Sequence, residues 1–213
     1  MLRLIALLFA AITFSTPAMA QLNRSEGETF IAAVREGDGT TAVSMLEQPG
    51  SRIANFKGFE GETALHIVTR KKSMNWLLTL LKYDAETNVT DRDGETPLLI
   101  ATQQRWVEGA ERLIRSGADV NTANSAGETP LIRAVLLRQP RLIKLLLESG
   151  ADPDRADYSA GLSARDYAAR DSRNPQILEM IESVGAADAG STGELKFGPT
   201  IEFPVGSNSG SDD

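Results

Sequence analysis

The tripeptide Gly-Glu-Thr recurs along this chain of 213 residues at a nearly constant spacing, and this repetition constrains the fold more than any other feature. Copies begin at Gly27, Gly61, Gly94 and Gly127, at intervals of 34, 33 and 33 residues, and a degenerate copy begins at Gly161. Such a period is typical of a solenoid, in which each small unit buries its apolar face only against its neighbours. The chain is therefore predicted to be a stack of about five repeats.

Each repeat has the pattern of two short helices. The threonine after the glycine can cap a helix, and Pro97 or Pro130 then occupies the first helical position, where a proline loses no hydrogen bond. After a polar break comes a second run with apolar residues at helical spacing, such as residues 142–146. The pattern predicts an all-α fold, with helix, turn, helix and loop in each unit.

The repeats resemble those of the ankyrin-repeat family. Residues 61–66 and 94–98 are similar to the family's opening Gly-x-Thr-Pro-Leu-His, and residues 117–121 and 150–154 are similar to its closing Gly-Ala-Asp-Val-Asn. The resemblance extends over about residues 27–186. It implies an ankyrin-repeat solenoid of about five helix-turn-helix repeats, joined by β-turn fingers, whose function is to bind another protein.

The predicted repeat domain spans residues 21–186. Its first and last repeats have charged residues for an outer face, as the capping repeats of a solenoid require. The predicted boundaries are 27–60, 61–93, 94–126, 127–160 and 161–186.

The first twenty residues have the features of a secretory signal peptide. Arg3 precedes an apolar run at residues 4–14, and Ala18-Met19-Ala20 supplies a cleavage site before Gln21. The run is about half as long as the roughly 20 residues of a membrane span, although an N-terminal anchor or a buried helix is the alternative. We therefore expect cleavage near Ala20 and a periplasmic or secreted mature chain without a membrane span.

Composition and motifs favour binding over catalysis. The chain has no cysteine, which excludes disulfides, thiol catalysis and cysteine-based zinc sites, and its net charge of −7 argues against nucleic acid as a partner. His66 is the only histidine, and the resemblance implies a structural role for it. The chain is predicted not to be an enzyme and to bind no cofactor or metal; an envelope protein with a ligand pocket or an active site on the solenoid is the alternative.

Two further local patterns leave alternatives open. The carboxylates Asp91, Asp93 and Glu95 surround one turn and suggest calcium, but a helix opens where further ligands would be needed, so an ordinary finger is preferred. Lys57 and residues 70–72 form a basic cluster, which is either a solvated face or a contact for an acidic partner.

The resemblance also implies where a partner binds, because the family presents its fingertips and first helices on a concave side. The corresponding positions here, which stacking is not expected to need, are Phe59, Glu62, Arg70, Lys71, Arg92, Glu95, Gln103, Gln104, Ser125, Glu128, Leu136, Leu137 and Tyr158. Leu136 and Leu137 are adjacent in a helix, about 100° apart, so at least one of them is expected to be exposed unless the core stripe is broad.

The two tryptophans are predicted to differ. Trp76 matches a core position of the family pattern and is expected to be buried, whereas Trp106 begins a second helix and is expected to be partly exposed.

Residues 187–213 form a low-complexity tail of small and polar residues. Within it, the segment 194–205 alternates apolar and polar residues and is predicted to be extended. We expect it either to dock intramolecularly on the repeats or to become ordered only on a partner.

Overall fold

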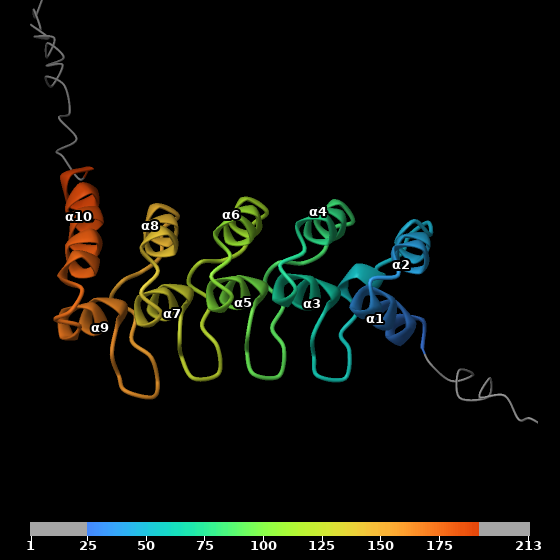
Figure 1. The fold of residues 1–213 in the computed structure, drawn as a ribbon, viewed down its shortest axis with the longest axis horizontal. Helices are drawn as coiled ribbons and strands as arrows, with labels where there is room; N and C mark the ends of the chain where they lie inside the picture. The colour runs from blue at the N-terminus through green and yellow to red at the C-terminus, as the bar shows by residue number, and fades with distance from the viewer. Residues whose placement is uncertain (1–24, 192–213) are drawn as a thin grey trace, which may run out of the picture.

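The computed structural model describes residues 25–191 and shows one row of stacked helix pairs (Figure 1). The predicted signal peptide and the segment 194–205 lie outside the described residues. One layer contains the first helices, which are α1 (Glu26–Glu36), α3 (Ala64–Arg70), α5 (Pro97–Gln103), α7 (Pro130–Leu136) and α9 (Ala164–Arg170). The other contains the second helices, which are α2 (Gly39–Leu46), α4 (Met74–Lys82), α6 (Val107–Arg115), α8 (Pro140–Glu148) and α10 (Pro175–Ser191).

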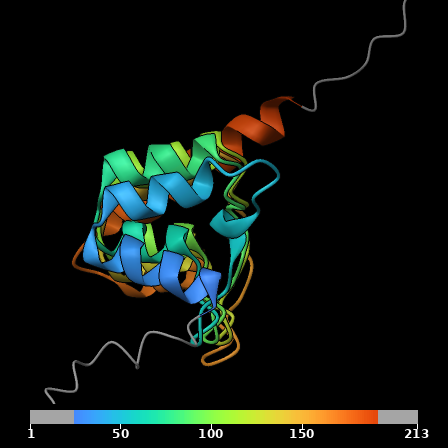
Figure 2. The ribbon, with the colours of Figure 1, turned by 90° about the vertical axis from the view of Figure 1, so that its right-hand side faces the viewer.

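The two layers are distinct when the row is viewed from its end (Figure 2), and the loops between repeats extend away from them as fingers. A short 3-10 helix, η2 (Ile53–Asn55), precedes the first finger. The described residues contain no β-strand, only an isolated bridge between Ala156 and Ser163. The predicted all-α solenoid of five helix pairs is therefore confirmed.

The glycine and the threonine of Gly-Glu-Thr have separate structural roles in the central repeats. Gly94 closes a finger turn with φ of 76°, and a Cβ there would lie 2.6 Å from the backbone nitrogen of Ser125 in the next finger. Only glycine fits, because it tolerates positive φ and lets the next finger approach closely. The threonine hydroxyl of Thr96 then caps α5 by accepting from the Leu99 N–H at 3.2 Å, as predicted.

The first copy of the tripeptide is an exception, because Gly27 lies inside α1 rather than in a turn. Ser25 caps this helix by accepting from the Glu28 N–H. A Cβ on Gly27 would lie 2.1 Å from the ring of Phe56, so the glycine makes room for an aromatic side chain. The glycine of the tripeptide therefore allows helix packing in the first repeat and shapes the finger turn in the others.

The core runs continuously through the row between the two helix layers. Leu98 and Leu131 are fully buried, as their register predicts. The prediction for the tryptophans is wrong: Trp106 is buried, whereas Trp76 is only partly buried against the core. A Cβ on Gly109 would lie 2.1 Å from the Trp106 ring, so a glycine one turn along α6 lets this ring fold inward.

A row of asparagines, which the sequence analysis missed, links the loops after the second helices. The carboxamide of Asn88 donates to the Gly117 carbonyl at 3.0 Å and accepts from the Asp119 N–H at 2.8 Å. Asn55 and Asn121 make the equivalent pair of bonds one repeat before and one repeat after. These three asparagines are spaced 33 residues apart, and this regular spacing is the feature of the sequence that predicts the row.

The last helix continues past the residue at which the repeat domain was predicted to end. Helix α10 ends at Ser191, although the repeat domain was expected to end at Ala186. No helix within residues 25–191 combines the length and the apolar character that a bilayer crossing requires.

Candidate protein-binding surface

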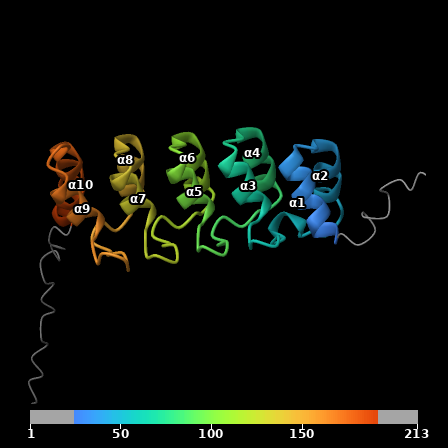
Figure 3. The ribbon, with the colours of Figure 1, turned by 60° about the horizontal axis from the view of Figure 1, so that its bottom comes forward.

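The fingers and the neighbouring sides of the first helices lie together along the row (Figure 3). We call this the finger–helix surface. It comprises the finger turns 58–61, 91–94, 124–127 and 157–161 and the partly exposed residues of α3, α5, α7 and α9. Ten of the thirteen predicted contact residues belong to this surface or to the loops that end its helices, and the other three, Glu62, Glu95 and Glu128, lie directly after its finger turns.

The fingertips are held in register by backbone hydrogen bonds between successive repeats. The N–H of Arg92 donates to the Glu60 carbonyl at 3.1 Å, and the N–H of Ser125 donates to the Asp93 carbonyl at 3.0 Å. The series continues at Tyr158, whose backbone N–H donates to the Ala126 carbonyl at 2.9 Å. Each finger is therefore fixed against its neighbour, and the tip side chains are presented once per repeat.

Aromatic side chains stand at both ends of this row of tips. Phe59 is 78% exposed and Tyr158 is 74% exposed, which is high for large apolar groups. The Arg92 guanidinium lies over the Phe59 ring, 4.5 Å from its centroid, and also pairs with Glu60 at 3.2 Å. The intermediate tips carry Arg92 and Ser125, so the row has an aromatic group at each end and polar groups between them.

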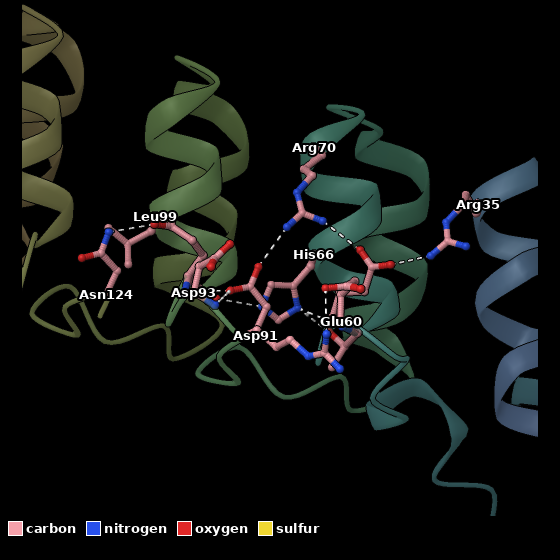
Figure 4. A network of polar contacts seen from close by, with 12 residues as sticks. Arg35, Glu60, His66, Arg70, Asp91, Asp93, Leu99 and Asn124 are labelled. Atoms are coloured by element: carbon pink, nitrogen blue, oxygen red, sulfur yellow. Dashed lines mark hydrogen bonds and ion pairs between the residues drawn. The ribbon is translucent and has the colours of Figure 1, made fainter. Parts of the chain in front are cut away.

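Glu62, Glu95 and Glu128, the glutamates of the three later Gly-Glu-Thr copies, are used in ion pairs within the scaffold, contrary to the expectation that stacking does not need them. Glu62 pairs with Arg35 of the preceding repeat and with Arg70, whose nitrogen lies 2.8 Å away. Arg70 also donates to Asp91 at 2.9 Å, which joins α3 to the next finger (Figure 4). These charges link α1, α3 and the finger at residues 91–94, and they are already partnered within the scaffold.

Arg133 is the buried centre of a second ion-pair group. Its guanidinium donates to Glu95 at 2.8 Å and to Glu128 at 2.6 Å, and it also bonds the Leu99 carbonyl. Burial by itself would lower the pKa of Arg133, but the bonds to the two carboxylates outweigh burial and raise it. Burial likewise opposes ionisation of Glu95, yet the Arg133 and Asn124 bonds lower its pKa. Arg133 and Glu95 are therefore both charged at neutral pH.

His66 ties its own helix start to the following finger. Its Nδ1 accepts from the Thr63 N–H at 3.1 Å, so Nε2 carries the proton and donates to the Glu95 carbonyl at 3.0 Å. Burial lowers the pKa of the imidazole, although the Glu95 carbonyl and the Asp91 charge oppose the shift. Both ring nitrogens are used within the scaffold, as the family resemblance implied.

The calcium interpretation of the second finger fails on its geometry. Asp91 Oδ1 accepts from the N–H groups of Asp93 and Glu95, both at 3.0 Å, while Oδ2 accepts from Arg70. The carboxylate therefore closes the turn. Among residues 25–191, no three His, Asp or Glu side chains are grouped as metal ligands would be.

The ends of the first helices contribute the other apolar and polar groups of the surface. Leu136 is 49% exposed and Leu137 is half-buried, which confirms that the pair cannot both enter the core. In the preceding repeat, Gln103 is exposed and Gln104 is half-buried. Lys71 is exposed and donates to the Arg35 carbonyl.

The hollows on this surface are small. One of about 240 Å³ is lined by Val135, Leu136, Arg138, Tyr167, Arg170 and Asp171. Another, of about 270 Å³, lies between α3, α5 and α7 beside Arg133. A larger, open hollow of about 700 Å³ lies elsewhere, at the loop 84–90. The two hollows on the surface are below the usual size of small-molecule sites, which favours a macromolecular contact there.

Comparison with known proteins agrees with this architecture. A family model described as ankyrin repeats, in three copies, matches residues 10–124 and residues 65–157, which together include more than half of the chain. The chain belongs to the ankyrin-repeat family. Ankyrin repeats generally mediate protein–protein interaction, and proteins built from them are typically non-enzymatic scaffolds. A comparison with curated protein sequences gives no match.

Proposed function

We propose that this ankyrin-repeat protein is an exported scaffold that binds another protein through its finger–helix surface. The observation that carries the proposal is the exposure of Phe59, Tyr158 and Leu136 on a surface whose backbone is fixed by bonds between fingers. Exposed aromatic and aliphatic groups on a rigid frame are typical of the residues that supply most binding energy. A preformed frame also reduces the entropy lost on association.

The internal contacts divide the surface into two classes of residue. Glu62, Arg70, Glu95 and Glu128 are committed to ion pairs within the scaffold, and Lys71 donates to the Arg35 carbonyl, so their contribution to a partner is secondary. The side chains that remain available for direct contact are Phe59, Arg92, Gln103, Gln104, Ser125, Leu136, Leu137 and Tyr158.

Capture experiments with matched surface variants test the proposal. Leu136→Glu and Tyr158→Ala should prevent capture of the natural partner from an envelope fraction, while the thermal midpoint changes little because both side chains are exposed. Leu78→Glu is the control, since Leu78 is a comparably exposed leucine, at 40%, on the second-helix layer. Equal capture by all variants would refute the assignment of this surface.

Export rests on the leader-like first twenty residues. N-terminal sequencing of the protein from the periplasm or medium should begin at Gln21 or within about two residues of it. Recovery of the uncleaved chain in the inner membrane would contradict export and support the anchor.

Intramolecular docking of segment 194–205 is a further part of the proposal. Because α10 continues to Ser191, truncation should follow that residue. A lower thermal midpoint would support docking as an added cap, and tighter partner binding would support docking across the binding surface. If neither quantity changes, the segment does not dock.

A further inference from the structure

The C-terminal ends of α3, α5, α7 and α9 carry a concentration of positive charge in a protein with a net charge of −7, whereas the end of α1 carries Glu36 and Asp38. We call residues 70–72, 103–105, 136–138 and 169–171 the helix-end ridge, since each group lies where a first helix turns toward its second helix. The ridge contains one aspartate, Asp171, and six basic residues: Arg70, Lys71, Lys72, Arg105, Arg138 and Arg170. All six are exposed.

The ion pairs on the ridge leave the cations outermost. The Arg70 side chain is 43% exposed, whereas its partners Glu62 and Asp91 are 13% and 5% exposed. Arg138 is 52% exposed above Asp171, which is 18% exposed. The carboxylates therefore lie beneath the guanidinium groups, and an approaching molecule meets positive charge first.

The backbone shows that turn geometry does not require these basic residues. Lys72, Arg105 and Arg138 have φ of 53°, 54° and 52°, in the left-handed region that residues with a Cβ avoid. The corresponding turn between α1 and α2 uses Gly37, with φ of 81°. A cation near a helix C-terminus is favoured by the helix dipole. After α3, Lys71 already supplies this cation at an unstrained φ of −83°, so the dipole does not account for a second one at Lys72.

A small hollow with mixed polar and apolar lining adjoins the charges at the C-terminal part of the ridge. The hollow beside Leu136 is lined by Val135 and Tyr167, by the basic side chains of Arg138 and Arg170, and by Asp171, which lies beneath Arg138. An aliphatic side chain could contact Leu136 while neighbouring carboxylates meet the two arginines. Charge and apolar surface thus specify one chemistry of ligand.

We propose that the partner contributes an acidic protein segment, which lies along the helix-end ridge and places an apolar side chain against Leu136. This inference rests on the proposed protein-binding function and names the chemistry of the partner. Nucleic acid is the less suitable polyanion, because a chain with a net charge of −7 repels a long phosphate backbone outside the ridge.

Labelled model peptides test the charge requirement directly. The probe is a fluorescent peptide of repeated Glu-Glu-Leu, compared with Gln-Gln-Leu and Lys-Lys-Leu peptides of the same length. The full mature chain should bind the acidic peptide, and binding should weaken as salt is raised, because exposed charges are screened. Equal binding of the Gln-Gln-Leu peptide would overturn the proposal.

Variants of the ridge complete the experiment. Changing Lys72, Arg105 and Arg138 together to glycine relieves the left-handed strain and should reduce affinity for the acidic peptide about tenfold or more. The control variant changes Lys82, Arg115 and Lys144 to glutamine, which removes the same charge from the second helices and should leave affinity within about twofold. Equal losses in the two variants would show a nonspecific field and overturn the proposal.

Two further outcomes separate this inference from the proposed function. Capture of the natural partner that depends on Leu136 but is unaffected by salt and by the glycine variant would retain protein binding and refute the acidic segment. Binding of single-stranded DNA or of phosphatidylglycerol vesicles more tightly than the acidic peptide would refute it in favour of a different polyanion.

Discussion

The junction between the second and third repeats and the junction between the third and fourth are built on the same backbone but differ in their polar contacts. At the first, His66 bonds the Glu95 carbonyl, and Arg70 joins Glu62 to Asp91 at the surface (Figure 4). At the second, the buried Arg133 joins Glu95 to Glu128. The corresponding places one repeat apart hold Leu99 for His66 and Ile100 for Arg133.

The comparison shows that a repeat protein can keep one apolar core while its polar links vary. A solvated arginine, such as Arg70, keeps much of its hydration, so each of its pairs contributes little. A buried arginine is different, because removing it leaves carboxylates without a partner in a region of low dielectric. The two junctions should therefore respond equally to core mutations and unequally to arginine mutations.

The largest expected effect is in the shared core. Leu98→Ala and Leu131→Ala should each lower the free energy of unfolding by about 3 kcal/mol, because both leucines are fully buried and each change opens a cavity. Denaturant titration measures the effect. If one variant has nearly normal stability, the two junctions do not share one core.

The arginines should separate the junctions. Arg133→Ala should lower the free energy of unfolding by about 2 kcal/mol, since Glu95 and Glu128 lose their partner. Arg70→Ala should lower it by less than about 1 kcal/mol, since its pairs are solvated. Arg133→Met combined with Glu95→Gln is the control and should recover part of the loss. Equal effects of the two alanine variants would remove the distinction.

His66 should make the first junction sensitive to mildly acidic pH. Its folded-state pKa is lowered, mainly by burial, whereas the unfolded pKa is about 6.5. Between the folded value and about pH 6.5 the unfolded chain binds the extra proton, so stability falls as pH drops, by at most about 1.4 kcal/mol per pH unit. His66→Gln should abolish this slope, measured by unfolding between pH 7 and pH 5, and an unchanged slope would exclude His66 as its source.

The smallest effect concerns the turn from α3 to α4, at the edge of the first junction. Lys72→Gly should raise the free energy of unfolding by up to about 1 kcal/mol, because φ is 53° there. The adjacent control, Lys71→Gly, should lower it by about 0.5 kcal/mol, since φ is −83°. Thermal unfolding compares them, and the same sign for both would contradict the strain argument.

Local sequence predicted most of the scaffold. The capping threonines and the prolines at 97 and 130 act within one helix turn, and the period repeats them, so the chain itself specifies where the first helices of the central repeats begin. The partial exposure predicted for Trp106 is wrong, because the burial of this ring depends on the space beside Gly109 rather than on its position at a helix start.

The sequence by itself determined the family, the number of helix pairs and the positions of the core leucines, because these follow from repetition and from spacing within a helix. Only the tertiary structure decided how Glu62, Glu95 and Glu128 are used. Glu95 meets Arg133, 38 residues away, because stacking brings successive repeats together. The charge of the helix-end ridge was likewise decided by stacking, since sequence places acids and bases in the same repeats but only packing puts the acids underneath.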